Sequence, residues 1–383
     1  MQTMRNRDYQ YLPQLTWLRG IAAIFVIISH TVRSTEEPYG AGDIASTSFL
    51  LKSLDLGGFG VALFFALSGA TLYISHRNDS LRADTLSFIA KRILRIFPAY
   101  LVSMAIFIMA IPAIQDIYGA QRGLWLEYFY KPHTYIDIIK NLAMISDLIG
   151  NPYSINPVYW SLPIEFRYYL IFPLALLLLQ AEKPIHLITS TAAITSLVLI
   201  PHFNPTIPHF FWLCSSFFGG MLVAYIHITT KSKSTISFCW LIPVFAIASI
   251  IMWHRSDLPK IPAFGIVHTY NNVLAVLTVF IAINATYASI PSAVKNALSF
   301  LGKVSYSIYL YHMLLLTFAF IVAMRIELHG DTKAYFILFT TCITSIPAAA
   351  ISYKYIEKPF IDFSKKIGRN RTIDLSEKIP SLK

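Results

Sequence analysis

The stretch LTWLRGIAAIFVIISHTVR, residues 15–33, has the length and composition of a helix that crosses a membrane. A helix needs about 20 mostly apolar residues to span a bilayer core of roughly 30 Å. Two ionisable residues interrupt the apolar run, Arg19 near its start and His30 eleven positions later. Because ionisable groups inside a membrane span are energetically expensive, they are candidates for function. The stretch therefore predicts a membrane fold and the first two residues of a site.

The composition of the whole chain agrees with a membrane fold. The 383 residues are 55% hydrophobic and 13% charged, whereas soluble globular proteins carry about 25% charged residues. Apolar runs recur along nearly the whole chain, so we predict an all-α integral membrane protein with one membrane domain. Its expected parts are an N-terminal arm over residues 1–14, the membrane domain over 15–357 and a basic tail over 358–383. No cleavable signal peptide is expected, because the first apolar run is long and follows a polar arm.

Ten apolar segments are predicted to cross the membrane. Placing both termini in the cytoplasm puts most Lys and Arg residues in inside segments, as the positive-inside rule requires. This arrangement accounts for much of the formal net charge of +11, so the bilayer is an expected contact and a nucleic acid is not. Segment 134–150 is amphipathic and too charged to span, which predicts an interfacial helix. The expected spans are residues 15–32, 57–75, 96–114, 160–179, 186–201, 209–228, 236–253, 270–288, 303–325 and 335–356.

Ionisable residues of three spans are predicted at similar depth. From Arg19 to His30 the helix rises roughly 16 Å, which takes His30 past the midplane. Glu165 and Arg167 are expected a turn or two below the outer interface, and His312 lies about 15 Å into its span. On depth alone, His30, Glu165 and His312 can converge, and a histidine with a carboxylate partner is a common acid/base arrangement. Glu165 can alternatively form an ion pair with Arg167.

Basic residues gather at the opposite side of the membrane. The sequence FIAKRILRIFPAY carries Lys91, Arg92 and Arg95 just before the third span. Arg92 and Arg95 are three positions apart and share a helix face, and Arg19 opens the first span from the same side. Guanidinium groups bind phosphate oxygens through paired hydrogen bonds. The sequence therefore predicts a phosphate-binding inner mouth below an acid/base centre.

Several other features are expected to be structural. The three cysteines, Cys214, Cys239 and Cys342, lie far apart within apolar runs, so neither a disulfide framework nor a metal site is expected. Small residues in GGFGVALFFALSG, residues 57–69, are expected to allow close helix packing. Glu357 and Lys358 are expected to end the last helix.

Six motifs occur in the order and spacing of a known family. The Arg19–His30 spacing is followed by GVALFFALSG, KRILRIFPAY, WSLPIEFRYYLIFP, LGKVSYSIYLYH and YIEKPF. Together they resemble the acyltransferase-3 family of bacterial membrane O-acyltransferases, from about Leu15 to Phe360. Where many members have two acidic residues after Trp-Ser-Leu, this chain has Glu165 and Phe166, and Arg167 replaces a common glutamine. Ala70 stands where an aromatic residue often follows Ser-Gly.

The resemblance implies a reaction and a set of roles. The family transfers an acyl group, usually acetyl, from cytoplasmic acyl-CoA to a hydroxyl of a glycan or lipid-linked saccharide beyond the bacterial inner membrane. By motif match, His30 corresponds to the family's essential histidine and Arg19 to its partner arginine. The pair Arg92 and Arg95 corresponds to the arginines on the acyl-CoA side. We expect His30 to act as the base, supported by Glu165. Direct transfer is the expected mechanism, with an acyl-histidine intermediate as a variant. The expected site residues are His30 and Glu165 as catalytic, Arg19, Arg92 and Arg95 as cofactor-binding, and His312, Tyr306, Arg167 and Ser161 as supporting or substrate-contacting.

Two other classes of protein share these features. A transporter or flippase would also have ten spans and buried charges, although the chain shows no internal repeat and no matching pair of broken spans. A membrane scaffold or sensor would tolerate replacement of the buried ionisable residues, and Tyr306, Tyr309 and His312 would then be core residues. Some acyltransferase-3 proteins carry a C-terminal esterase-like domain, so this chain is expected either to acylate its acceptor directly or to use a separate periplasmic partner. The sequence does not identify the acceptor.

Overall fold

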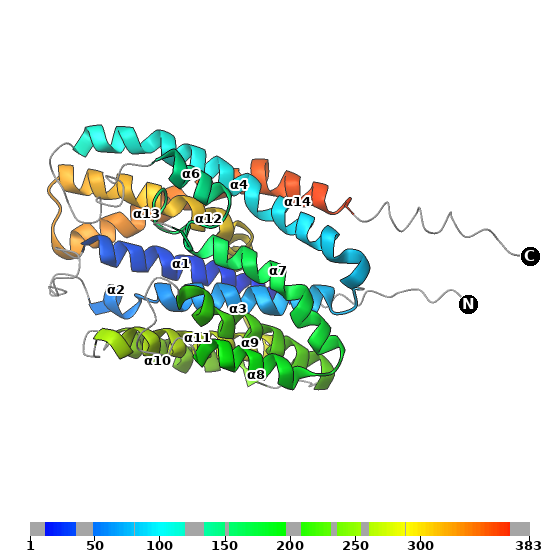
Figure 1. The fold of residues 1–383 in the computed structure, drawn as a ribbon. Coiled ribbons are helices and arrows are strands. Elements are labelled where there is room, and N and C mark those ends of the chain that lie inside the picture. The colour runs from blue at the N-terminus through cyan, green and yellow to red at the C-terminus, as the bar shows by residue number, and fades with distance from the viewer. Residues whose placement is uncertain are drawn as a thin grey trace, which may run out of the picture.

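The computed structural model of the chain describes residues 12–35, 49–79, 81–118, 134–149, 153–196, 208–230, 236–253, 260–287 and 289–367. Within these ranges the protein is a helical bundle (Figure 1), with one parallel pair of two-residue strands, β1 (Ile236–Ser237) and β2 (Ala285–Thr286). The helices are α1 (Pro13–Thr35), α2 (Phe49–Ser53), α3 (Gly57–His76), α4 (Leu81–Tyr118), α6 (Tyr135–Leu142), α7 (Ser161–Gln180), α8 (Pro184–Ser196), α9 (Pro208–Thr230), η3 (Phe238–Trp240), α10 (Leu241–Trp253), α11 (Lys260–Asn284), α12 (Ser292–Arg325), α13 (Gly330–Ser352), η5 (Tyr353–Glu357) and α14 (Lys358–Ser364).

Each of the ten expected spans overlaps a helix of the described residues, which confirms the all-α fold. Among the described residues, 8 helices are long and apolar enough to cross a membrane. The expected spans 186–201 and 236–253 correspond to α8 and α10, which have 13 residues each. Residues 197–207 and 254–259, next to these helices, lie outside the described ranges. The chain begins α1 and ends α14 at the same end of the bundle (Figure 1), as an even number of crossings requires.

Two expected features outside the spans differ in the structure. Glu357 does not end the last helix, because it closes the π-helical turn η5 and the chain continues as α14. The expected interfacial helix over residues 134–150 is present as the shorter α6, and Thr134 caps its start through Asp137. Residues 1–11 of the expected arm and 368–383 of the expected tail lie outside the described ranges.

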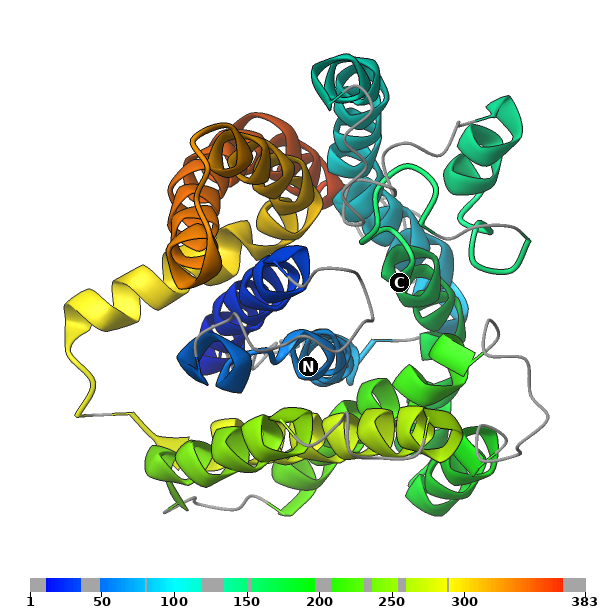
Figure 2. The same cartoon turned by 90° about the vertical axis from the view of Figure 1, so that its left-hand side faces the viewer.

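Helices α1 and α3 form the centre of the bundle. Viewed along the bundle in Figure 2, α12 and α13 lie on one side of this central pair and α9, α10 and α11 on the other. Helix α1 packs against α3 and α12, while α3 packs against α9 and α11. The side chains of the central helices are therefore shielded from lipid. Polar groups in a membrane protein are tolerated in such a shielded interior.

Glycines allow the central helices to approach their neighbours closely. A Cβ atom at Gly302 on α12 would lie 1.9 Å from the carbonyl oxygen of Thr16 on α1. A Cβ atom at Gly69 on α3 would lie 1.9 Å from the carbonyl oxygen of Phe217 on α9. No larger side chain fits at these contacts without moving a backbone. The expected packing role of the glycines is confirmed.

Helix α7 starts inside the bundle instead of at its surface. The non-helical residues just before it, 154–156 and 158–159, are buried. The Asn156 side chain donates to the carbonyl oxygen of Leu310 on α12 (3.0 Å), and the Tyr159 hydroxyl pairs with Ser103 Oγ on α4 (2.7 Å). Irregular backbone at membrane depth is tolerated where protein surrounds it. As a result, the first turns of α7 lie deeper than the sequence predicts.

Candidate active site

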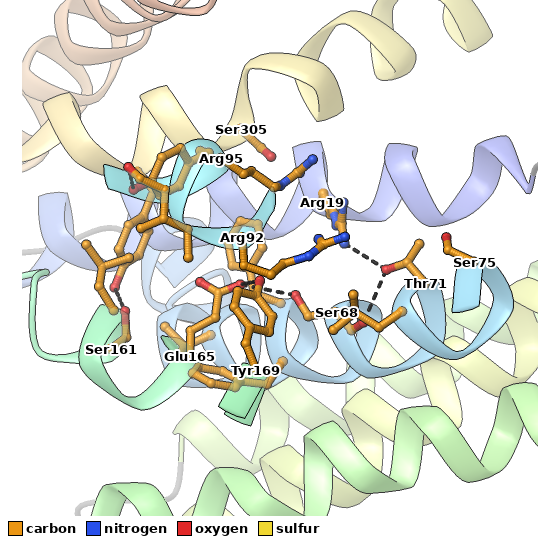
Figure 3. A pocket seen from close by; sticks show the side chains of 18 residues that line it. Arg19, Ser68, Thr71, Ser75, Arg92, Arg95, Ser161, Glu165, Tyr169 and Ser305 are labelled. Carbon is orange, nitrogen blue, oxygen red and sulfur yellow. Dashed lines mark hydrogen bonds between the residues drawn. The ribbon is translucent and has the colours of Figure 1, made fainter. Parts of the chain in front are cut away.

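A cavity of about 310 Å³ lies between α1, α3, α4, α7 and α12. Along α3 its lining residues run from Ser75, near the helix end, to Val61, which corresponds to about 21 Å of helix rise. Its polar side chains point toward one another in Figure 3. We call it the arginine cavity, after Arg19, Arg92 and Arg95, which line it together with Glu165.

Each arginine of the cavity is held differently. Arg19 donates a hydrogen bond from Nη2 to Thr71 Oγ1 (2.8 Å). The Arg92 guanidinium lies over the rings of Phe88 (5.2 Å) and Tyr169 (5.6 Å), and its buried Nε has no hydrogen-bond acceptor among the described residues. Arg95 lies one turn further along α4 and interacts electrostatically with Glu357. The three guanidinium groups come from α1 and α4, as the sequence predicts.

Glu165 is the carboxylate of this cavity. It accepts hydrogen bonds from Ser68 Oγ (3.3 Å) and from the Tyr169 hydroxyl. With three guanidinium groups against one carboxylate, the lining carries a net positive charge. A low-dielectric site with that charge attracts an anionic ligand.

His30 and His312 form a hydrogen-bonded pair. Nδ1 of His30 lies 2.9 Å from Nε2 of His312, and the ring centroids are 5.1 Å apart with the planes inclined by 22°. Nδ1 of His312 lies 3.0 Å from the carbonyl oxygen of Ile308. His312 is fully buried and His30 is half-buried. The predicted convergence of these two residues is confirmed, and we call them the histidine pair.

The histidine pair lies just beyond the deep end of the arginine cavity. Tyr309 lines the cavity, and its ring centroid is 5.9 Å from that of His312, one helical turn further along α12. The Tyr309 hydroxyl donates to the carbonyl oxygen of Val158 (2.9 Å) and pairs with Ser161 Oγ (2.7 Å), so it ties α12 to the start of α7. Tyr306, another lining residue, donates to the carbonyl oxygen of Ile96 on α4 (3.0 Å).

The predicted convergence of Glu165 with the histidines is wrong. Glu165 contacts Ser68, which lies one turn along α3 from Thr71, the partner of Arg19. It therefore lies at the level of the arginines, and His30 is paired with His312 instead. The error follows from the buried start of α7, which places Glu165 deeper than a span starting at the interface would.

Arg167 lies outside the arginine cavity. Its guanidinium forms an ion pair with Asp147 and lies over the ring of Phe210 (5.5 Å), so the alternative Glu165–Arg167 pair is not formed. Sequence reasoning also missed Ser68, Thr71 and Tyr169, whose hydroxyls bind the charged groups of the cavity. Tyr169 lies four positions after Glu165 on the same helix face, whereas Ser68 and Thr71 lie on α3, where the sequence indicated no site residue. Within the described ranges, no cluster of His, Cys, Asp and Glu could hold a metal ion.

Comparison with known proteins assigns the family. A family model described as an acyltransferase domain, acyltransferase-3, matches residues 12–353. The chain belongs to this acyltransferase family. It is thus a multi-pass membrane acyltransferase. This assignment excludes the transporter and the scaffold as alternatives.

The chain covers different shares of its relatives, and it spans little more than half of one of them. O-acetyltransferase OatA of Staphylococcus aureus (strain NCTC 8325 / PS 47) is 27% identical over 391 residues, which cover 91% of this chain and 57% of that protein. ORF330 of Acidianus two-tailed virus, which carries an acetyltransferase name, is 27% identical over 80% of this chain and 83% of its own length. Nodulation protein 10 of Rhizobium leguminosarum bv. viciae is 26% identical over 78% and 81%. No solved structure matches the chain.

Proposed function

We propose that this acyltransferase takes an acetyl group from acyl-CoA at the arginine cavity and passes it to a hydroxyl of a cell-surface glycan. One observation carries the proposal: a cavity with three guanidinium groups leads to a histidine pair one turn beyond its deep end. Such a site can hold an anionic donor at one end and remove a proton at the other. Acyl transfer from a phosphorylated thioester to an alcohol requires both the binding of an anionic donor and the removal of a proton.

The arginines bind the phosphate groups of the donor. Guanidinium groups form bidentate hydrogen bonds with phosphate oxygens, and the Nε of Arg92 is a buried donor that a phosphate oxygen would satisfy. The apolar lining residues Val61, Phe64 and Leu162 lie further in and suit the thioester arm. Fixing the donor in this way holds the thioester carbon near the histidine pair, which lowers the entropic part of the barrier.

His30 removes the proton of the acceptor hydroxyl as that oxygen attacks the thioester carbon. General-base catalysis of this kind contributes about 10²–10⁴-fold to a rate. Glu165 acts at the donor end of the site instead of orienting His30, since it is bonded to Ser68 and Tyr169. Transfer is direct, so no acetyl group is attached to the protein during turnover.

The distribution of basic residues supports one orientation of the protein in the membrane. The arginine cavity begins at the end of the bundle where the chain starts, and the positive-inside rule assigns this end to the cytoplasm. The protein then lies in the bacterial inner membrane, takes acyl-CoA from the cytoplasm and presents His30 toward the periplasmic side. It acts on the glycan directly or hands the acetyl group to a periplasmic partner.

The test uses the full-length protein in lipid nanodiscs with radiolabelled acetyl-CoA. Mass spectrometry of surface glycans from cells with and without the gene first identifies the acceptor. With that acceptor, His30→Ala should abolish transfer, while the exposed His186→Ala serves as the matched control. Transfer by His30→Ala at the wild-type rate would refute the assigned base. Label bound to the protein in the absence of acceptor would refute direct transfer.

A further inference from the structure

The hydrogen bonds of the histidine pair determine which ring nitrogens carry protons. A backbone carbonyl oxygen can only accept, so the contact between His312 Nδ1 and the Ile308 oxygen requires a proton on Nδ1. A neutral imidazole carries one N–H, which leaves Nε2 of His312 as an acceptor. Nε2 lies 2.9 Å from His30 Nδ1, and that nitrogen must therefore be the donor. The lone pair of neutral His30 is then on its Nε2.

We propose that His312 is a positioning residue that holds His30 in the tautomer with a basic Nε2 and takes up proton charge from it during acyl transfer. This inference rests on the proposed function and assigns the reacting atom of that site. His312 acts only through His30.

The packing of α1 against α12 supports this role. The close contact between Gly302 and Thr16 fixes the two backbones, and Trp17 Nε1 donates to Ser299 Oγ (2.7 Å) nearer the helix starts. The His312 ring is fully buried and is anchored to its own helix by the Ile308 carbonyl. A ring held on both sides in this way presents Nε2 to His30 in one fixed direction.

Two carboxylates of the described residues, Glu165 and Glu357, bind hydroxyl groups. Glu165 is bonded to Ser68 and Tyr169, and Glu357 accepts a hydrogen bond from Ser307. His312 is a hydrogen-bond partner of His30, and its imidazole can orient His30 as a carboxylate does in many acid/base sites. Arg33, three residues along α1, places a positive charge near His30. Sharing the added proton with His312 spreads the charge of the imidazolium over two rings.

The proton transfers balance over one turnover. The acceptor oxygen forms a bond to the thioester carbon, and its proton moves to Nε2 of His30. The Nδ1 proton of His30 shifts toward Nε2 of His312, whose own Nδ1–H then makes a charge-assisted hydrogen bond to the Ile308 oxygen. When the C–S bond breaks, the protons move back and the Nε2 proton passes to the CoA thiolate. The products are the acetyl ester and CoA thiol.

The kinetic test compares two replacements of His312 in the full-length protein. Alanine removes the acceptor of the His30 Nδ1 proton, and we expect kcat for acetyl transfer to fall by about 100-fold. Glutamine offers a carbonyl oxygen that accepts this hydrogen bond but takes up no proton, and we expect it to recover about tenfold of that loss. The KM for acetyl-CoA should stay within about twofold of wild type in both variants, because general-base catalysis and donor binding use different groups. His186→Gln is the control, since His186 is exposed.

A spectroscopic test reads the tautomer without activity. Solid-state NMR of the 15N-histidine-labelled protein in nanodiscs distinguishes protonated from bare ring nitrogens, and His30→Ala assigns the His30 signals. We expect a protonated Nδ1 and a bare Nε2. A bare Nδ1 on His30, or a kcat of His312→Ala within threefold of wild type, would overturn the inference. If His312→Ala does not fold, the activity of His312→Gln and the NMR measurement still test the inference. Loss of the proposed function would instead appear as a wild-type protein that transfers no acetyl group.

Discussion

Arg92 gives the sharpest test of donor binding. Its guanidinium is held between two aromatic rings, and its buried Nε has no acceptor among the described residues. A phosphate oxygen of CoA would supply that acceptor. Hydrogen bonds to charged groups contribute about 1.5–3 kcal/mol, so Arg92→Ala should raise the Kd for CoA by about 10- to 150-fold. Arg92→Lys should recover part of the loss, because lysine keeps the charge but not the planar fork.

The assay is calorimetric titration of CoA and of acetyl-pantetheine into wild-type and Arg92→Ala protein in nanodiscs. Acetyl-pantetheine lacks the nucleotide phosphates, so the substitution should weaken CoA binding and leave acetyl-pantetheine binding unchanged. Arg325→Ala is the matched control, because Arg325 is exposed at the far end of α12. Equal CoA affinity of wild type and Arg92→Ala, or equal weakening of both ligands, would refute phosphate recognition by Arg92.

Two further predictions concern the scaffold. Gly302→Ala should lower the Tm and reduce transfer activity. The new Cβ would meet the Thr16 carbonyl oxygen at 1.9 Å and push apart the helices that carry the histidine pair. The control Gly58→Ala, whose Cβ would have its nearest atom at 3.0 Å, should lower the Tm less. For the ion pair between Asp147 and Arg167, a double-mutant cycle of unfolding free energies should give a coupling of about 0.5–3 kcal/mol with the Kd for CoA unchanged. A coupling near zero would contradict a structural role for the pair.

Much of the fold could be predicted from apolar runs alone. The spans read from the sequence coincide with helices because about 20 apolar residues have few alternatives to a helix in a bilayer. Prediction failed at positions where tertiary contacts determine where a helix begins or ends. The chain continues from α13 through the turn η5 into α14 because Glu357 is buried against Ser307, which a sequence does not display.

The site was predicted in its residue types and only partly in its geometry. Counting helix rise placed His30 near His312 correctly, since both lie on helices that cross the bundle fully. The same count failed for Glu165, because the segment before α7, in which residues 154–156 and 158–159 are buried, moves the start of α7 inward. The partner of Arg167 could not be foreseen either, because Asp147 lies 20 positions away outside any helical period.

Helices α1 and α12 keep a constant offset in sequence. Trp17 pairs with Ser299 and His30 with His312, and both pairs are separated by 282 positions. The two helices thus run parallel and in phase over some 20 Å of rise, so that contacts near the arginines fix the alignment of the histidines. One residue added to α1 between these contacts would turn His30 by about 100° away from its partner. A one-residue insertion in this part of α1 would therefore break the contact between the two rings, even if the helix stayed as apolar as before.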